Sequence, residues 1–488
     1  MKSLETPQTL RLLEAPLDRS PGAELLQRQL HRRLKEAILR HAIGAGTKLP
    51  SSRELATELA VSRNTVSLVY EHLAAEGYIA CDRRGTRVST LTPLPPRHAL
   101  REKRHPVTAR RLSEIQLVRP ATPDAVWLRP GVPSLADFPL AAWRRSLERA
   151  LQHGGAALLN YGDPMGQMEL RVAICRHLAL TRGVGCEPEQ IVITEGAIEG
   201  LNLCVRLLTD PGDIGWLENP CYRGARTAMQ SGDLRIVPCR VDEEGLVWNA
   251  RDRATAPPRL IYTTPSHQFP RGIVMSVARR LELIANAGKC GAWIIEDDYD
   301  GEFRYTGEPI AAMVGLVPLA PVIYVGSFSK TMFPSLRLGF IVLPRNLLAA
   351  TAGTLREMLR GGNRHVQLAM ADFMESGQFA RHLGRMRRLY RARQRELRAA
   401  LTQHLRVPNS VEGGDCGLHL TVRFDARHPD RKIAALAAEH QLAPMPLSAL
   451  TLAPGAQDNG LVLGYGNTSA ELFDPLVKTL ATLVAQAR

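Results

Sequence analysis

A single lysine in the second half of the chain has neighbours that suit covalent chemistry. Ser327 and Ser329 precede Lys330 closely, and Arg337 follows seven residues later, within the segment VGSFSKTMFPSLRLG. A lysine amine forms an imine with an aldehyde, and hydroxyl and guanidinium groups donate hydrogen bonds to a phosphate. The segment therefore predicts a site for pyridoxal 5'-phosphate (PLP), with Lys330 as the Schiff-base lysine and the other three side chains as phosphate donors.

Lys330 follows one of several short apolar runs that predict the strands of a parallel sheet. From Trp127 onward such runs alternate with helical patterns, which is typical of an α/β fold with a mostly parallel sheet. Ligands in such sheets bind at the carboxyl ends of the strands, so polar residues at these ends should converge on one site. Four runs with such ends are 191–194, 259–265, 292–300 and 321–330.

Residues near the ends of other runs supply further groups that a cofactor ring needs. A carboxylate beside the pyridine nitrogen keeps that nitrogen protonated. We assign this role to Asp297, because it shares a strand face with Tyr299, whose phenol could bind the ring oxygen; the other two acids of the Glu-Asp-Asp run are expected to face solvent. Gly196 and Ala197 begin a helix, where free backbone N–H groups favour phosphate. Tyr222 is an aromatic residue that could stack on the ring.

The first ninety residues carry a different pattern, in which short helices precede a hairpin. Apolar residues recur at every fourth position over 26–38. A short second helix begins with a capping box, formed by Ser51 and Glu54. A third helix begins after Ser62 and ends at Gly77, and the sequence YIACDRRGTRVST predicts a hairpin. Polar and cationic groups at the start of the third helix are what a recognition helix presents to the major groove.

The charge distribution supports a polyanionic partner. The chain has 488 residues and a formal net charge of +14, with 45% hydrophobic residues, which is enough for a sizeable core. Residues 1–112 contain 20 Lys and Arg against 11 Asp and Glu, so most of the excess lies there. We therefore predict double-stranded DNA as a partner of this region.

The cysteines and the apolar runs exclude several other classes of protein. The eight cysteines are scattered without a CxxC pair, so neither a metal site nor a disulfide framework is expected. No apolar run reaches the length of about 18 residues that a membrane helix needs. We expect a soluble cytoplasmic protein with reduced thiols and no membrane partner.

Residues 22–90 resemble the GntR-type winged helix-turn-helix. The resemblance rests on LPSSRELATEL, on VSRNTVSLVYEHLAAEGYI and on the glycine-containing hairpin, in that order. It implies that the protein binds a DNA operator and that the hairpin is a wing. The DNA-contacting residues that it implies are Arg53, Arg63, Asn64, Thr65, Arg84, Gly85 and Thr86. Residues 91–123, rich in Pro and Arg at their start, are predicted to be a basic linker.

Residues 124–488 resemble the fold-type I PLP-dependent aminotransferases. Six phrases follow the family order: LNYGDPMGQMELR, ITEGAIEGLNL, WLENPCYRGAR, TPSHQFPRG, IIEDDYDGEFRY and GSFSKTMFPSLRLGF. Joined to a GntR-type module, this region resembles the MocR/GabR-like transcriptional regulators. The resemblance implies a mostly parallel sheet, a smaller C-terminal α+β part, and a homodimer in which the DNA module packs against the partner's large domain.

The same resemblance assigns roles to individual residues. Lys330 would bind the PLP aldehyde, Asp297 the pyridine nitrogen and Tyr299 the ring hydroxyl. The remaining cofactor-binding residues that it implies are Tyr222, Gly196, Ala197, His267, Ser327, Ser329 and Arg337.

Three positions depart from the aminotransferase pattern. Val462 stands where the family carries an arginine that holds the substrate carboxylate, and such a bidentate clamp is hard to replace. Ile198 replaces a polar residue of the phosphate loop, and FPRG stands where many enzymes have the asparagine of NPTG. We therefore expect the cofactor site to be retained and recognition of an ordinary α-amino acid to be lost. Arg223 and Arg271 are candidates for binding an anionic effector. The alternative for either arginine is an exposed charge without a binding role.

These patterns predict a DNA-binding transcriptional regulator whose aminotransferase-like domain senses PLP, an amine or an amino acid through aldimine chemistry at Lys330, with at most weak transaminase activity. The alternative is an active aminotransferase that carries an accessory DNA-binding domain. The missing carboxylate arginine argues against the alternative, while Asp297 and Lys330 favour it. A DNA-binding scaffold without cofactor would require the whole phosphate-binding set to be a coincidence.

Overall fold

The computed structural model divides the chain into two compact units, Met1–Val107 and Thr108–Arg488. The residues that the structure describes are 16–83, 85–91, 108–115, 126–307, 310–452 and 458–487. Arg84 and most of the predicted linker, residues 92–107 and 116–123, lie outside them. Within the described residues, no helix combines the length and apolar character needed to cross a membrane.

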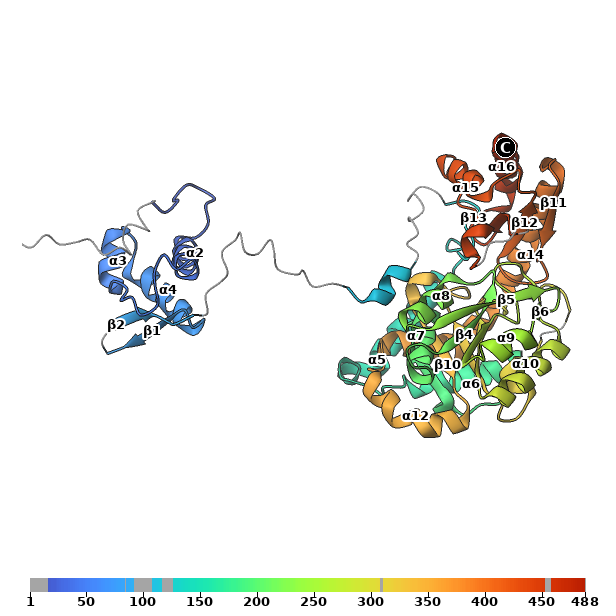
Figure 1. The fold of residues 1–488 in the computed structure, drawn as a ribbon, viewed down its shortest axis with the longest axis horizontal. Helices are drawn as coiled ribbons and strands as arrows, with labels where there is room; N and C mark the ends of the chain where they lie inside the picture. Colours follow the sequence, from blue (N-terminus) through green and yellow to red (C-terminus); the bar gives the residue numbers. More distant parts are fainter. Residues whose placement is uncertain are drawn as a thin grey trace, which may run out of the picture. The chain divides into compact units, whose positions relative to one another are not determined.

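The N-terminal unit is a small helical bundle with an antiparallel hairpin (Figure 1). Its elements are α2 (Leu26–Leu39), α3 (Ser52–Glu58), α4 (Arg63–Ala75), β1 (Ile79–Asp82) and β2 (Gly85–Val88). The capping box at α3 forms as predicted: the Glu54 N–H donates to Ser51 Oγ over 3.2 Å, and the Ser51 N–H donates to the Glu54 carboxylate over 2.8 Å. The apolar stripe of α2 packs against α4, and the shared core includes Leu30, Leu34, Ile38, Leu55, Val66, Val69 and Leu73.

The C-terminal unit is built on a mixed sheet of eight strands in the described residues. In spatial order the strands are β3 (Ile191–Thr194), β10 (Gly339–Val342), β9 (Val322–Ser327), β8 (Trp293–Asp298), β7 (Leu260–Thr263), β4 (Ile214–Asn219), β5 (Arg235–Asp242) and β6 (Gly245–Leu246). Strands β9, β8, β7, β4 and β5 are parallel, whereas β10 is antiparallel to both its neighbours and β6 to β5. The sheet is therefore mostly parallel, as predicted.

Helices cover both faces of this sheet (Figure 1). The helices of the layers are α5 (Leu140–Gly154), α6 (Met168–Arg182), α7 (Ala197–Leu208), α8 (Arg223–Ser231), α9 (Ala250–Thr255), α10 (Val277–Cys290), α11 (Met313–Leu316), α12 (Arg345–Met358) and α13 (Arg364–Glu375). Ile295 and Ile323 pack with residues of α7 and α8 on one face, whereas their neighbours Ile294 and Val322 pack with residues of α10 on the other. Burial on both faces explains why the strands are continuous apolar runs.

The C-terminal part forms a smaller α+β layer, as predicted. Its antiparallel strands, in spatial order, are β11 (Asn409–Glu412), β12 (His419–Phe424), β14 (Gly460–Gly464) and β13 (Met445–Pro446). Its helices are α14 (Gln378–His404), α15 (Asp430–Glu439) and α16 (Phe473–Gln486). Helix α14 packs against α16, and the core of this part is continuous with that of the large sheet.

Candidate cofactor site and nucleic-acid interface

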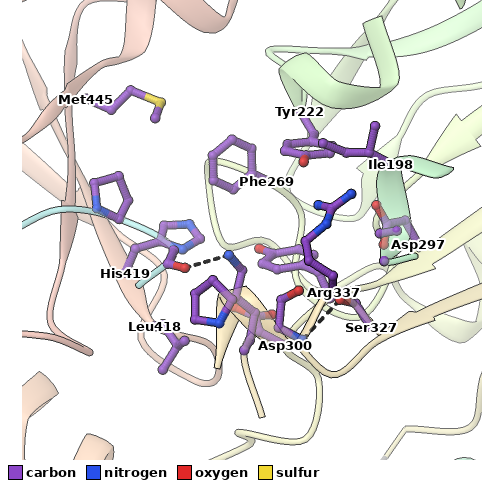
Figure 2. Close-up of a pocket in the computed structure, with 18 residues that line it drawn as sticks. Ile198, Tyr222, Phe269, Asp297, Asp300, Ser327, Arg337, Leu418, His419 and Met445 are labelled. Carbon is purple, nitrogen blue, oxygen red and sulfur yellow. Dashed lines mark hydrogen bonds between the residues drawn. The ribbon is translucent and has the colours of Figure 1, made fainter. Parts of the chain in front are cut away.

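A cavity of about 270 Å³ lies at the carboxyl ends of β8 and β9 (Figure 2). It brings together residues that are far apart in the sequence, because the carboxyl ends of parallel strands share one edge of the sheet. Its lining residues are Pro130, Gly131, Gly196, Ala197, Ile198, Tyr222, Phe269, Asp297, Tyr299, Asp300, Ser327, Ser329, Lys330, Pro334, Arg337, Leu418, His419 and Met445. Every residue predicted to bind the cofactor is among them except His267.

One end of the cavity is rich in hydrogen-bond donors. Gly196 has φ 87°, a conformation that favours glycine, and caps α7 so that the helix's first N–H groups begin at the cavity. Ser327 ends β9, and Arg337 precedes the amino end of the antiparallel β10, where Gly339 pairs with Ser327. Because β10 runs antiparallel to β9, Arg337 lines the same cavity as Ser327 and Ser329. A helix N-terminus, two hydroxyls and a guanidinium group suit a phosphate.

Lys330 lies where β9 gives way to the loop before β10. Its Nζ donates a hydrogen bond to the Gly131 carbonyl oxygen over 2.5 Å. Burial lowers the pKa of the lysine, and the nearby carboxylates of Asp300 and Asp297 oppose this effect. A lowered pKa increases the fraction of neutral amine, which is the form that reacts with an aldehyde.

Asp297 has one carboxylate oxygen bound and one free. Oδ2 accepts a hydrogen bond from the Tyr262 hydroxyl over 2.7 Å, whereas the buried Oδ1 has no hydrogen-bond partner among the described residues. Burial raises the pKa of Asp297 to about 7. An unpartnered buried carboxylate oxygen is costly, and a protonated ring nitrogen would satisfy it. The residues present therefore fit PLP at both its phosphate and its ring nitrogen.

The two acids beside Asp297 are buried, which corrects the prediction that they face solvent. Strand alternation turns Glu296 and Asp298 to the face opposite Asp297. There Arg280 lies 3.7 Å from Glu296, and Arg182 donates a hydrogen bond to Asp298. Both carboxylates therefore pair with guanidinium groups inside the protein. The Glu-Asp-Asp run alone does not indicate that such partners exist.

Aromatic residues surround the space where a ring would lie. Phe269 packs edge-on against Tyr222 and against Tyr299, with ring centroids 6.0 Å apart in both pairs. Phe269 follows TPSHQ in the quoted phrase, but phenylalanine is an ordinary core residue and gave no signal of a role in the site. The sequence also did not indicate Gly131 and Asp300 as site residues. Gly131 contacts Lys330 through its backbone carbonyl, which any residue carries, and Asp300 directly follows Tyr299, to which a role was already assigned.

His267 does not line the cavity, and its contact with the cofactor remains a prediction. Its Nδ1 lies 3.0 Å from both carboxylate oxygens of Asp300 and 3.0 Å from the Tyr299 hydroxyl. The His267 ring also stacks with that of Tyr299. His267, Asp300 and His419 form a buried cluster, in which one ligand atom from each residue lies within 4.8 Å of the other two. His267 is therefore placed to position Tyr299.

The loop that carries Phe269 is fixed on two sides. On one side the buried Glu218 accepts hydrogen bonds from Thr264 and Gln268. On the other side the Pro270 carbonyl oxygen lies 2.9 Å from His419 Nε2 and accepts a hydrogen bond from Thr421 over 2.6 Å. The loop therefore connects the large sheet to β12 of the small one.

Arg271 also belongs to this connection, and its position answers one of the open alternatives. Its guanidinium group makes two hydrogen bonds of 3.0 Å to Glu412 in β11. The two N–H groups with which Arg271 would hold an anionic effector are therefore already bound to Glu412. Arg271 is therefore a structural ion-pair residue, neither an effector clamp nor an exposed charge.

Replacing Asp297 by asparagine is expected to make the stability of the cofactor-free protein less dependent on pH. The folded-state pKa of about 7 lies above the ordinary value of 3.8, so the folded protein binds more protons than the unfolded chain between these values. The stability that this group contributes is present below about pH 4 and is lost as the pH rises to about 7. Urea unfolding midpoints across this range measure the effect. Asparagine keeps an acceptor for Tyr262, and an unchanged pH dependence would contradict the assignment.

The N-terminal unit places most of the predicted DNA contacts on or near its surface. Arg53 on α3 and both Arg63 and Asn64 at the start of α4 are exposed. Thr65 is half-buried, and its N–H donates to the Ser62 cap over 3.0 Å. In the hairpin, Gly85 and Thr86 are half-buried at the start of β2, where the φ of Gly85 is 119°. An exposed helix start and an adjacent hairpin are the parts of a winged helix that face DNA.

Comparison with known families assigns both units. Residues 26–88 match the gntR family of bacterial regulatory proteins, and residues 123–459 match the aminotransferases of class I and II. The fold and the site thus define a fusion of a GntR-type winged helix with an aminotransferase-like domain. The chain belongs to the MocR-type transcriptional regulators, and it is a DNA-binding regulator.

Two relatives carry the family assignment over nearly the whole chain. The probable rhizopine catabolism regulatory protein MocR of Rhizobium meliloti is 37% identical, over 92% of this chain and 91% of its own length. The HTH-type pyridoxine biosynthesis transcriptional regulator PdxR of Corynebacterium glutamicum is 33% identical, over 90% of this chain and 91% of its own.

Solved structures identify the fold of the C-terminal unit. The α-aminoadipate aminotransferase LysN of Thermus thermophilus superposes with a TM-score of 0.70 at 24% identity, over 78% of this chain and 97% of its own. The kynurenine aminotransferase of Pyrococcus horikoshii gives a TM-score of 0.68, also at 24% identity, over 80% of this chain and 96% of its own. The C-terminal unit therefore has the aminotransferase fold.

Proposed function

We infer that this regulator binds PLP in the cavity at Lys330 and uses it to sense a small molecule. The observation that carries the inference is the pairing of two groups in one cavity. Lys330 presents an amine of lowered pKa, and Asp297 presents a buried oxygen without a partner among the described residues. An amine for an aldehyde and a carboxylate for a ring nitrogen match the two ends of the PLP ring.

The remaining lining residues have the roles that this orientation of PLP requires. Ser327, Ser329 and Arg337, with the N–H groups at Gly196 and Ala197, would hold the phosphate. Tyr299 would donate to the ring oxygen, and Tyr222 would pack on the ring. When bound, PLP supplies an aldehyde that condenses reversibly with primary amines. PLP itself, or an amine or amino acid that reaches it, is the effector class that such chemistry can detect.

We favour a sensor over an active aminotransferase, because the described lining of the cavity lacks a carboxylate clamp. Val462 is fully buried at the position of the expected arginine, and Arg271 is paired with Glu412. The regulator is expected to be a cytoplasmic homodimer. An effector can shift the arrangement of its DNA-binding units only by binding two arrangements with different affinities.

The direct test of cofactor binding is covalent trapping. The full chain is incubated with PLP, reduced with borohydride and analysed by peptide mass spectrometry. We expect a phosphopyridoxyl adduct on Lys330 and on none of the exposed lysines. An adduct distributed over surface lysines, or no adduct, would refute the proposed function.

If Arg63 contacts a base, replacing it by alanine is expected to weaken binding of operator DNA by about 1–3 kcal/mol. If it contacts a phosphate, the magnitude of the slope of the logarithm of the binding constant against the logarithm of salt concentration is expected to fall by about one. The probe is a duplex selected from a random library by the wild-type protein, and affinity is measured across salt concentrations. Arg28→Ala, which removes an exposed arginine from α2, is the charge-matched control. Equal losses in both variants would show that only net charge matters.

A further inference from the structure

The side of the cavity formed by the small sheet carries no cation among the described residues. Figure 2 shows Met445, Leu418 and His419 together on this side, across from Asp297, Ser327 and Arg337. The two cations that line the cavity are Lys330 and Arg337, and both are committed to the cofactor in the proposed function. A ligand group that reaches the small sheet therefore contacts neither of these two cations.

The strand register explains why this side is uncharged. Val462 lies opposite both Met445 and Thr421, and Gly464 lies opposite His419. Directly opposed residues of antiparallel strands share one face, so these five residues form a continuous row. None of them is an acid, a lysine or an arginine. Of this row, Met445 and His419 line the cavity, and Met445 is apolar.

His419 does not supply the missing positive charge. Its Nε2 lies 2.9 Å from the Pro270 carbonyl oxygen, which requires a proton on that nitrogen. Burial lowers the pKa of His419 to about 3, so the ring is neutral. A neutral ring with a proton on Nε2 offers Nδ1 as a hydrogen-bond acceptor, which disfavours a carboxylate.

Two guanidinium groups at the small sheet, one in β12 and one in the loop that contacts β11, are used elsewhere. Arg423 continues the row, opposite Gly460, and its Nη1 lies 3.2 Å from Glu412. Arg271 is paired with the same glutamate. Meanwhile Asp300 lines the cavity and adds negative charge. A carboxylate bound here would lose its hydration without gaining a counter-ion, which is strongly unfavourable.

We propose that the effector cavity selects primary amines that carry no carboxylate over the corresponding α-amino acids. The proposal rests on the proposed function, in which the effector is an amine that reaches PLP. Met445, Leu418 and Phe269 provide an apolar surface for an uncharged substituent, and Asp300 attracts an ammonium group. The selected class is therefore monoamines with an apolar or weakly polar tail.

The test uses pairs of ligands that differ only by the carboxylate. The PLP-loaded full chain is titrated with 2-phenylethylamine against L-phenylalanine, and with 3-methylbutylamine against L-leucine. Calorimetry gives the dissociation constants, and binding to the library-selected duplex gives a second readout. We expect each amine to bind at least about tenfold more tightly than its amino acid, and to shift DNA affinity at lower concentration.

A cation placed on the small sheet should weaken this preference. Met445→Arg is expected to reduce the ratio between amine and amino acid by at least about tenfold, whereas the neutral variant Met445→Gln should retain it. Tighter binding of the amino acids to the wild type, or failure of both ligand types to bind, would overturn the proposal. The Lys330 adduct would still form in either case, so the proposed function fails only if that adduct is absent.

Discussion

Replacing Lys330 by alanine is expected to abolish covalent retention of PLP by the full chain. Lys330 is the lysine that lines the cavity, and no other lysine among the described lining residues offers an amine to the aldehyde. After borohydride treatment the variant should show no phosphopyridoxyl adduct, and dialysis should remove bound PLP. The phosphate donors and Asp297 remain, so weak reversible binding of PLP is expected to survive.

The matched control for this variant is Lys478→Ala. Lys478 is an exposed lysine on α16, and its removal changes the net charge by the same amount. This control should give the full wild-type adduct. Persistence of a stoichiometric adduct in Lys330→Ala would show that another lysine binds the aldehyde and would overturn the assignment.

Replacing Arg182 by methionine is expected to lower the free energy of unfolding by about 3–5 kcal/mol, because it leaves a buried carboxylate without its cation. Arg182 is 4% exposed at the end of α6 and donates a hydrogen bond to Asp298. The Tyr324 hydroxyl also donates to Asp298, over 2.7 Å, but a hydroxyl carries no charge. The measurement is the urea midpoint of the C-terminal unit's transition in the full chain.

The same helix provides the control for this substitution. Arg176 pairs with Glu375 over 2.8 Å, and its side chain is 66% exposed. Arg176→Met should therefore cost at most about 1 kcal/mol. Adding Asp298→Asn to Arg182→Met should restore part of the stability, since no buried charge is then unpaired. Similar losses for the Arg182 and Arg176 variants would show that the buried pair is not a major stabilising interaction.

Much of the architecture follows from the sequence for a clear physical reason. Strands buried on both faces must be continuous apolar runs, and the run 191–194 coincides with β3. Capping residues such as Ser51 and Ser62 mark helix starts because they satisfy free N–H groups locally. The positions of these elements depend on neighbouring residues in the chain, so a sequence can reveal them.

The parts of the site that escaped prediction depend on contacts between distant segments. Phe269 faces Tyr222 only because two strand ends meet, and the Gly131 carbonyl reaches Lys330 across 199 residues of sequence. The acids beside Asp297 were expected to face solvent because their guanidinium partners, Arg182 and Arg280, lie on helices elsewhere in the chain. Periodicity separates the faces of a strand, but it does not show what covers each face.

The loop from Thr264 to Arg271 has a mechanical consequence. It is held to the large sheet through Glu218 and to the small sheet through His419, Thr421 and Glu412. A ligand that pushes Phe269 aside cannot move this loop alone without breaking a bidentate ion pair. Any displacement of Phe269 would therefore also strain the contacts that tie the loop to the small sheet.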